Sequence, residues 1–267
     1  MTTLTQLMDM RGTRTMITGG LGHIGKVIAE TLAELGSDLV LVDLPSAQSE
    51  DFCSRLTSTW DVNVIYFACD LENERERDAM ITLLKSDGIG LNCLVNNAAF
   101  VGDSDLQGWV APFEEQAIQT WRRALEVNLI APFHLSRSFA PELSASGKGS
   151  IINIASIYGE FGPDWRLYEE TTMGNPAAYA ASKGGLLQLT KWLATTMAPN
   201  VRVNAISPGG ICRNQPEKFV SRYVAKTPLG RMATEQDLIG AIAYMTSNMS
   251  LYVTGQVLRV DGGWGVV

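Results

Sequence analysis

The chain has 267 residues, of which 46% are hydrophobic and 18% charged, a mixture that excludes a disordered chain, a coiled coil and a collagen-like repeat. A net charge of −7 without a basic block makes nucleic acid an unexpected partner. No signal segment and no long apolar run are evident, and the four scattered cysteines form no CxxC pair, so we expect a cytoplasmic protein without a membrane partner and without a metal.

Short apolar runs alternate with helical patterns along the whole chain. Strands are predicted at 14–18, 38–43, 62–68, 91–96, 150–155, 201–206 and 256–260. Helices are predicted at 24–35, 73–85, 114–143 with a kink near Pro132, 177–198 and 235–247. Strands without polar alternation are typical of a parallel sheet covered on both faces. We therefore predict one α/β domain over residues 1–267, built on a doubly wound parallel sheet.

A glycine-rich turn follows the first predicted strand and leads into a helix. It reads TGGLGHIG, in which Gly20, Gly22 and Gly25 fit the spacing G-x-G-x-x-G. Glycines allow the backbone and the positive end of a helix to approach a pyrophosphate. The alternative is a tight strand-to-helix turn that binds nothing. The residues expected to contact a dinucleotide here are Gly19, Gly22, His23, Ile24 and Gly25.

Further cofactor contacts are expected after the next three strands, because the carboxyl ends of parallel strands meet at one edge of a sheet. Asp43 ends the second strand, where a carboxylate accepts hydrogen bonds from the adenosine ribose diol and repels a 2′-phosphate. NAD is therefore predicted rather than NADP, although Asp43 could instead start a turn before Pro45. The other expected contacts are Leu44, Asp70, Leu71, Asn97, Ala98 and Ala99.

A tyrosine and a lysine stand near the start of the predicted helix 177–198. Their spacing of four puts the Tyr179 phenol and the Lys183 ammonium on one face of the helix. A phenol has a pKa of about 10, and a neighbouring cation lowers it, which makes the tyrosine a candidate acid or base. The alternative is one interfacial tyrosine and one solvated lysine.

Two polar residues are expected near the same edge of the sheet. Ser156 follows the fifth strand and is a candidate for holding a substrate oxygen, unless it only caps a turn. Asn128 interrupts the apolar pattern of the long helix, where a buried amide requires a partner. The other interpretation of Asn128 is a helix kink before Pro132.

With these residues in this order, the sequence resembles the short-chain dehydrogenase/reductase family over nearly the whole chain. Further matching pieces are Pro208-Gly209 after the sixth strand and TGQVLRVDGG at 254–263. The resemblance implies a Rossmann-type sheet of seven strands in the order 3-2-1-4-5-6-7. It also implies a homodimer or a homotetramer.

The resemblance implies roles for the polar residues. Tyr179 would transfer the proton, Lys183 would bind the nicotinamide ribose and lower the pKa of Tyr179, Ser156 would stabilise the substrate oxygen, and Asn128 would hold a water in a proton relay. The remaining cofactor contacts that it implies are Tyr179, Lys183, Pro208, Gly209 and Ile211.

The sequence departs from the family's pattern at the glycine turn and after the sixth strand. His23 occupies the place of a common glycine, so Gly22 is expected to supply the close approach to the cofactor. Where many members carry a threonine, this chain reads Gly210-Ile211-Cys212-Arg213, and the Ile211 backbone is expected to contact the carboxamide. Arg213 either binds a carboxylate or phosphate of the substrate or forms a surface salt bridge.

Three segments are longer than the family's pattern requires. They lie near 100–113, 159–177 and 210–230. The segment 159–177 is expected either to pack over the substrate or to contact another subunit through its exposed apolar residues, namely Phe161, Trp165, Leu167 and Tyr168. The segment with Trp109 is expected to form the other lip of the substrate site.

We therefore expect an NAD(H)-dependent oxidoreductase that interconverts a secondary alcohol and a ketone of a small molecule by hydride transfer. A polar sugar or sugar-derived substrate is expected from Arg213, from the mixture of aromatic and acidic residues in 159–177, and from a resemblance to members associated with bacterial surface-sugar pathways. The alternatives are a reductase of 3-oxoacyl or other hydrophobic ketones and a nucleotide-binding regulator without catalysis.

Overall fold

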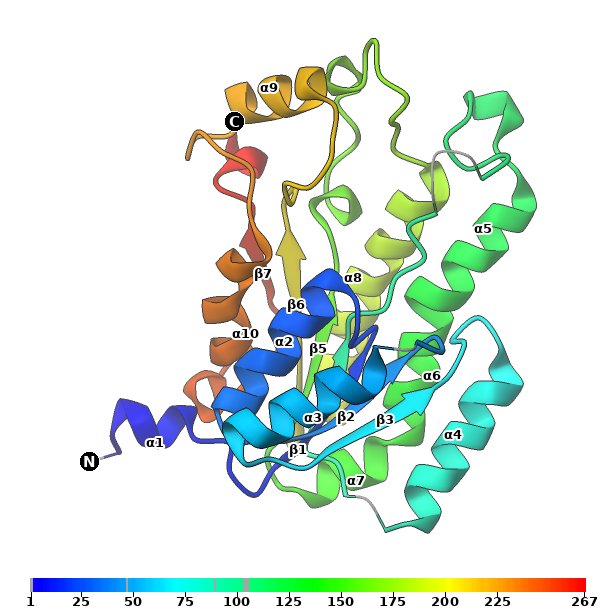
Figure 1. Ribbon diagram of the computed structural model, residues 1–267. Coiled ribbons are helices and arrows are strands. Elements are labelled where there is room, and N and C mark those ends of the chain that lie inside the picture. Colours follow the sequence, from blue (N-terminus) through cyan, green and yellow to red (C-terminus); the bar gives the residue numbers. More distant parts are fainter. Residues whose placement is uncertain (1, 47, 89, 103–105) are drawn as a thin grey trace.

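A seven-stranded parallel sheet forms the centre of the computed structural model, which describes residues 2–46, 48–88, 90–102 and 106–267 (Figure 1). The strand order is β3-β2-β1-β4-β5-β6-β7, which confirms the predicted topology. The observed strands are β1 (Arg14–Thr18), β2 (Asp38–Asp43), β3 (Val64–Ala68), β4 (Cys93–Asn96), β5 (Gly149–Ile154), β6 (Val201–Pro208) and β7 (Val257–Val260). Each begins and ends within two residues of its predicted position.

Helices connect the strands and cover the sheet. They are α1 (Leu4–Met8), α2 (His23–Glu34), α3 (Ser49–Trp60), α4 (Glu74–Ser86), α5 (Ile118–Leu125), α6 (Ala131–Ser138), α7 (Ala140–Ala145), α8 (Ala177–Met197), α9 (Glu217–Lys226) and α10 (Ile239–Thr246). Within the described ranges, none of these helices combines the length and the apolar character that crossing a membrane requires.

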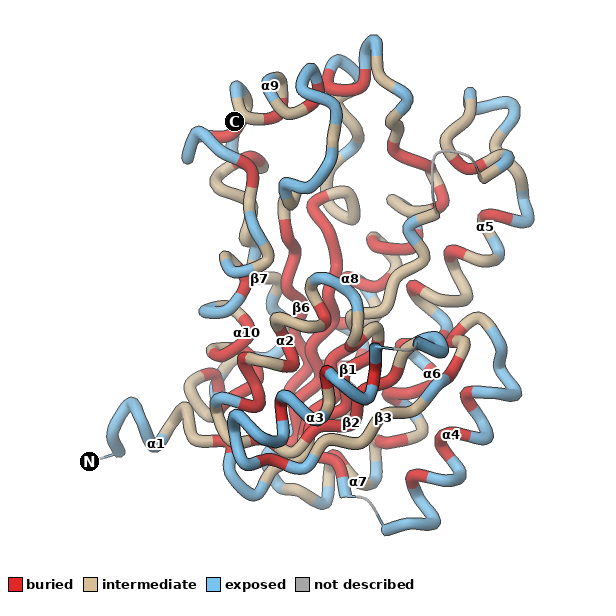
Figure 2. Tube along the Cα trace, in the orientation of Figure 1, coloured by how far each residue is buried: buried red, intermediate tan, exposed pale blue. Residues whose placement is uncertain are grey.

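The two faces of the sheet have separate apolar cores. On one face, Ile17 of β1 packs with Ile28 of α2 and Ile242 of α10. On the other, the adjacent Met16 packs with Leu135 of α6 and Leu193 of α8. Neighbouring residues of one strand thus enter opposite cores, which explains why the strands are continuous apolar runs. Figure 2 shows the buried residues concentrated along the strands, with exposed residues on the outer sides of the helices.

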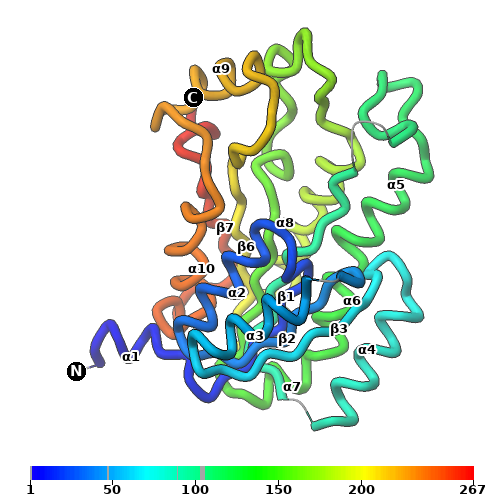
Figure 3. The backbone as a smooth tube through the Cα atoms, viewed as in Figure 1, coloured from blue at the N-terminus to red at the C-terminus, as the bar shows by residue number. Residues whose placement is uncertain are grey.

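Three of the observed helices, α1, α3 and α9, were not among those predicted from the sequence. The helix α3 is rich in serine and threonine, which favour other conformations, and it is held by burial of Phe52 and Leu56. The helix α9 lies inside the segment expected as a loop near 210–230, and it buries Phe219 and Tyr223. Figure 3 shows α9 beyond the carboxyl end of β6, close to the C-terminus.

The long helix predicted at 114–143 is interrupted. It begins as α5, widens into a π turn at Glu126–Ile130, and continues as α6 and α7. Pro132 has no N–H to donate to the carbonyl of Asn128, four residues earlier, and its ring would crowd that carbonyl in a regular α-helix. The wider turn accommodates this proline and places Asn128 at the irregular point of the helix.

Candidate active site

A cleft of about 560 Å³ lies at the carboxyl ends of β1, β2, β3 and β4. The predicted cofactor residues that line it are Gly19, Gly22, His23, Ile24, Gly25, Asp43, Leu44, Asp70, Leu71, Asn97, Ala98 and Ala99. These residues come from four separate turns, and the parallel sheet brings them to one edge. The lining also includes Phe100, Val101 and Arg123, which sequence reasoning did not assign to the cofactor.

The glycine turn at the start of α2 has the shape of a phosphate cradle. Gly19 has a φ of +63°, and a Cβ on Gly25 would lie 1.9 Å from the carbonyl oxygen of Gly19. Gly22 is the N-cap of α2 and provides no side-chain cap, so the first N–H groups of the helix remain available for an anion. A Cβ on Gly22 would meet Gly19 O at 3.3 Å, so the tightest contact of the turn is at Gly25. The cleft and its glycines therefore fit a dinucleotide.

Asp43 and Asn97 are fixed at the edge of this cleft. The carboxylate of Asp43 accepts hydrogen bonds from Leu21 N and Leu44 N, both at 2.8 Å. The amide of Asn97 donates to Thr18 O at 2.9 Å and so ties the end of β4 to the glycine turn. Each carboxylate oxygen of Asp43 can accept a further bond, which leaves it able to bind a diol.

Lys183 is buried against the carboxyl end of β5. It is 2% exposed, and its ammonium donates to the carbonyl oxygen of Ile154 at 2.8 Å. The ammonium lies 5.9 Å from the centre of the Tyr179 ring, so the two side chains share one face of α8 as predicted. Burial lowers the pKa of Lys183 from 10.5 to about 8. At neutral pH the side chain therefore remains mostly charged.

Tyr179 is half-buried and lies beside Ser156. Burial raises the pKa of the Tyr179 phenol, and interaction with the Ser156 hydroxyl lowers it in part. Lys183 was expected to lower this pKa, but in the protein alone the effect of burial prevails and the ammonium hydrogen-bonds to Ile154. A lower pKa thus requires a further positive charge beside the phenol.

Ser156 caps a turn and also lies beside the Tyr179 phenol. Its hydroxyl oxygen accepts from Tyr158 N at 3.2 Å at the start of a short 3₁₀ turn, as the capping alternative suggested. Because the hydroxyl accepts that bond, its own proton is free for another acceptor. The two interpretations of Ser156 are therefore compatible.

Asn128 is fully buried, and its side chain is already engaged. Its Oδ1 accepts from Phe100 N at 2.6 Å, and its Nδ2 donates to Phe100 O at 3.2 Å and to Ser182 Oγ at 2.9 Å. Ser182 in turn donates to Tyr179 O, so the π turn is tied to the helix with the tyrosine. Sequence reasoning did not single out Ser182.

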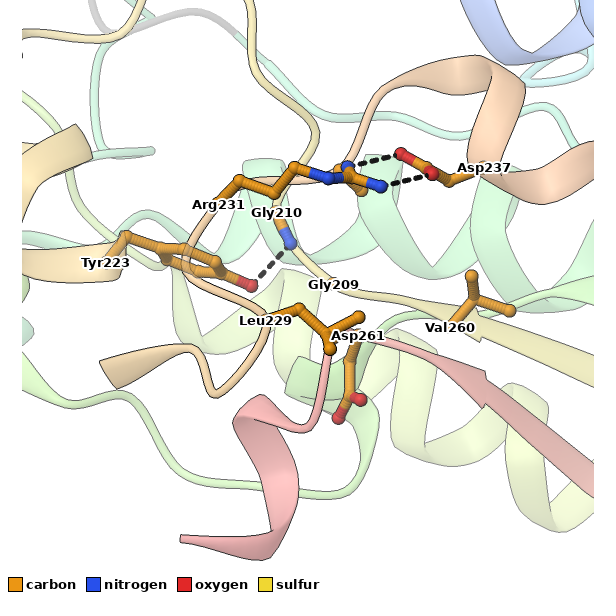
Figure 4. Close-up of a pocket in the computed structure, with 10 residues that line it drawn as sticks. Gly209, Gly210, Tyr223, Leu229, Arg231, Asp237, Val260 and Asp261 are labelled. Carbon is orange, nitrogen blue, oxygen red and sulfur yellow. Dashed lines mark hydrogen bonds and ion pairs between the residues drawn. The ribbon is translucent and has the colours of Figure 1, made fainter. Parts of the chain in front are cut away.

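The predicted contacts after β6 lie apart from the cleft of about 560 Å³. Pro208 ends β6, Gly209 lines a small pocket of about 120 Å³, and Ile211 pairs with Ala233 in an isolated bridge. Figure 4 shows this pocket, where Gly210 N donates to the Tyr223 hydroxyl and Arg231 forms an ion pair with Asp237. Tyr179 and Lys183 also lie outside the lining of the cleft of about 560 Å³.

Arg213 forms the surface salt bridge that was one of its two expected roles. Its Nε lies 3.1 Å from Glu235 Oε1. Arg213 lines the cleft of about 560 Å³ and not the cavity of about 380 Å³ that Tyr179 lines. The argument for an anionic or sugar substrate that rested on this guanidinium is therefore weakened.

A second cavity, of about 380 Å³, adjoins the cofactor cleft through shared lining residues Val101 and Gly102. Tyr179 lines it, so the phenol faces this space. Most of the wall is aromatic or aliphatic, and the larger apolar side chains are Trp109, Tyr158, Tyr168, Met173, Phe219, Tyr223 and Met232. This cavity is the candidate substrate site.

All three extra segments contribute to the wall of the second cavity. From 159–177 come Tyr168, Met173 and Asn175, and from 210–230 come Gly210, Gln215 and Phe219. Leu167 and Tyr168 are buried within the chain, which contradicts their expected exposure as a subunit contact. Trp109 is also buried and lines the cavity, whereas residues 103–105 of the segment 100–113 lie outside the described residues.

Comparisons with known proteins agree with this geometry. Residues 21–265 match the family model described as Enoyl-(Acyl carrier protein) reductase. The chain is 32% identical over 264 residues to the 3-oxoacyl-[acyl-carrier-protein] reductase of Rickettsia typhi. The aligned region covers 96% of this chain and 98% of the relative.

Solved structures match over the full length as well. A short-chain dehydrogenase from Leptospira borgpetersenii with bound NAD⁺ has a TM-score of 0.83 and 32% identity, covering 99% of this chain and 96% of that one. A gluconate 5-dehydrogenase from Burkholderia cenocepacia in complex with NADP and tartrate has a TM-score of 0.86 and 26% identity, covering 99% and 100%. The first of these structures holds NAD⁺ and the second NADP, so the two differ in cofactor.

Proposed function

The chain belongs to the short-chain dehydrogenase/reductase family, and from that premise we propose that it interconverts a secondary alcohol and a ketone of a small molecule with NAD(H) as cofactor. Family membership makes the chain an oxidoreductase that binds NAD or NADP. The observation that carries the proposal is the meeting of Ser156, Tyr179 and Lys183 beside the cavity of about 380 Å³.

In the proposed reaction, the bound cofactor supplies or accepts the hydride. The hydroxyl of Ser156, whose oxygen already accepts from Tyr158 N, donates a hydrogen bond to the substrate oxygen, keeps its proton and holds that oxygen near Tyr179. Tyr179 gives a proton to that oxygen in ketone reduction and takes it back in alcohol oxidation. Lys183 keeps a positive charge below the phenol and binds the nicotinamide ribose. Asn128 would hold a water in the proton relay that leads to solvent.

NAD rather than NADP is proposed because of the charge at the adenosine end of the cleft. Asp43 is held by two backbone N–H groups, so its carboxylate is fixed in position and cannot easily turn away from a 2′-phosphate. The adjacent Leu44 offers no positive charge to compensate.

The expected sugar substrate and the alternative hydrophobic ketone both remain candidates. The aromatic wall, with Trp109 and Phe219, favours a substrate that buries apolar surface. Flat aromatic faces also accommodate the carbon rings of sugars, so the lining does not exclude a neutral sugar. A reductase of hydrophobic ketones is therefore the second candidate, and the aromatic lining is the observation that favours it.

We also propose that the whole chain is one dinucleotide-binding domain that assembles as a homodimer or homotetramer. The support is three exposed apolar side chains: Trp192 of α8 is 54% exposed, Ile130 of the π turn 44% and Phe133 of α6 37%. Light scattering of the purified protein measures the molar mass of the oligomer. We expect Trp192→Glu to lower that mass toward the value of one chain.

The proposed reaction is tested with Tyr179→Phe, which removes only the hydroxyl. We expect wild type to oxidise NADH with a panel of cyclic and open-chain ketones, and the variant to lose about 10²- to 10⁴-fold in kcat. Binding of NADH, measured by fluorescence titration, should persist in both proteins. If wild type binds NADH and the variant retains the full rate, the assigned chemistry is wrong. Binding without turnover in wild type would favour the non-catalytic regulator.

A further inference from the structure

Asn175 is a buried amide in the wall of the substrate cavity. It lies in the segment that leads into α8, just before Pro176, and it is 6% exposed. Neither Nδ2 nor Oδ1 has a hydrogen-bond partner among the described residues. A buried amide without partners costs free energy, so such a group needs an explanation such as a ligand.

The other amides around this cavity are satisfied by the protein. Gln215 lines the same cavity, but its Nε2 donates to Ile211 O and its Oε1 accepts from Arg213 N, both at 2.7 Å. Asn128 is bonded to Phe100 and to Ser182. Asn175 therefore differs from its neighbours in keeping both a donor and an acceptor free.

The charge of the cavity restricts what could pair with this amide. No lysine, arginine, histidine, aspartate or glutamate is among the described residues that line it. A carboxylate or phosphate in a largely apolar cavity would lack a counter-charge, which is unfavourable. A hydroxyl both donates and accepts, so it can satisfy the two atoms of an amide without bringing a charge.

The surrounding rings indicate the shape of the partner. Phe219 lies between Tyr168 and Tyr223, at ring-centre distances of 5.4 and 5.9 Å. The hydroxyls of Tyr158 and Tyr168 lie 2.5 Å apart and bond to each other, which uses one of their two protons. A cavity of about 380 Å³ is at the small end for ligand sites. A single substituted ring suits these dimensions better than a long acyl chain.

We propose that Asn175 is a specificity-determining residue that selects neutral ring ketones and alcohols carrying a second hydroxyl, which its amide binds. The proposal rests on the proposed function and deepens it, because it names the substrate class of the same site. It places neutral sugars and hydroxylated alicyclic ketones inside the class. Sugar acids and unsubstituted ketones lie outside it.

The test compares pairs of ring ketones that differ in one group. Wild type and Asn175→Leu are each assayed with NADH and three kinds of substrate: cyclohexanone, its hydroxylated derivatives and a ring ketone with a carboxylate. Leucine keeps the approximate size of the asparagine side chain. We expect wild type to favour a hydroxylated ketone over cyclohexanone by about 5- to 100-fold in kcat/KM. In Asn175→Leu that ratio should fall to about one.

A stability measurement separates recognition from a structural role. Because the amide of Asn175 has no partner among the described residues, Asn175→Leu should melt at or above the wild-type temperature. Gln215→Leu is the matched control, and it should melt lower because it loses two bonds to the backbone. A lower melting temperature for Asn175→Leu together with an unchanged substrate ratio would show that Asn175 is structural, and would overturn the proposal.

Other outcomes distinguish this inference from the proposed function. If wild type prefers the carboxylated ketone, the substrate class is wrong while the oxidoreductase activity stands. If wild type reduces no ketone at all, the proposed function fails. The inference is then tested by calorimetry, which measures the binding of cyclohexanediols to wild type and to Asn175→Leu in the presence of NADH. Binding that depends on Asn175 would then support the inference, and binding equal in both proteins would overturn it.

Discussion

Replacing Lys183 with methionine is expected to stabilise the protein at neutral pH while removing a residue of the proposed reaction. The side chain is 2% exposed, and burial lowers its pKa from 10.5 to about 8. At about 1.4 kcal/mol for each tenfold change in proton affinity, keeping the buried ammonium charged costs about 3 kcal/mol. The bond to Ile154 O returns about 1 kcal/mol. Lys183→Met should therefore unfold with a free energy about 2 kcal/mol higher at pH 7.

The pH dependence of this difference is the decisive measurement. Between pH 8 and 10.5 the unfolded chain still holds the proton of Lys183 while the folded chain has released it, so wild type gains stability as the pH rises. The advantage of Lys183→Met should shrink by about 3 kcal/mol over this range. Below pH 8 the advantage should be constant.

Urea unfolding of the cofactor-free proteins at a series of pH values between 7 and 10.5 provides these free energies. Lys191→Met is the matched control, because Lys191 is an exposed lysine on the same helix. An advantage of Lys183→Met that stays constant with pH, or that grows as the pH rises, would refute the assignment of Lys183 as a buried cation.

Three further outcomes are expected. Asp43→Asn should lower the preference for NADH over NADPH about tenfold in paired binding titrations, because it removes a negative charge from the adenosine end; an unchanged ratio would contradict this. Gly25→Ala should weaken NADH binding at least about tenfold and lower the melting temperature, since its Cβ would lie 1.9 Å from Gly19 O, whereas Gly90→Ala, with nothing within 4 Å, should do neither. Because burial raises the pKa of the Tyr179 phenol, ketone reduction should keep its rate from neutral pH into the alkaline range, whereas alcohol oxidation should rise with pH; parallel profiles in the two directions would count against Tyr179 as the proton carrier.

The fold and the cofactor cleft followed from local features of the sequence. Strand and helix periods, together with turn glycines, identify a parallel α/β sheet, and the order of the strands came from the family resemblance. Residues that follow successive strands, such as Asp43 and Asn97, must meet at one edge of such a sheet wherever their loops go. Likewise, a spacing of four on a helix places Tyr179 and Lys183 together without tertiary information.

The burial and pairing of individual side chains were not accessible in the same way. Sequence spacing put Lys183 near Tyr179, but only the packed structure turns its ammonium to Ile154 O and makes burial dominate the pKa of the phenol. Arg213 could equally have faced the substrate, and its pairing depends on Glu235, which lies 22 positions further along the chain.

The sequence alone therefore determined the sheet and the spacing that puts Tyr179 and Lys183 on one helix face, because periodicity and short spacings act within a few turns of the chain. The family followed from the order of its motifs. Only the tertiary structure decided the character of the substrate cavity. Its neutral aromatic wall is assembled from segments that lie far apart in sequence, including Trp109, Asn175 and Phe219. Which of their atoms find partners depends on long-range packing, and no local pattern shows that the buried amide of Asn175 has no partner among the described residues.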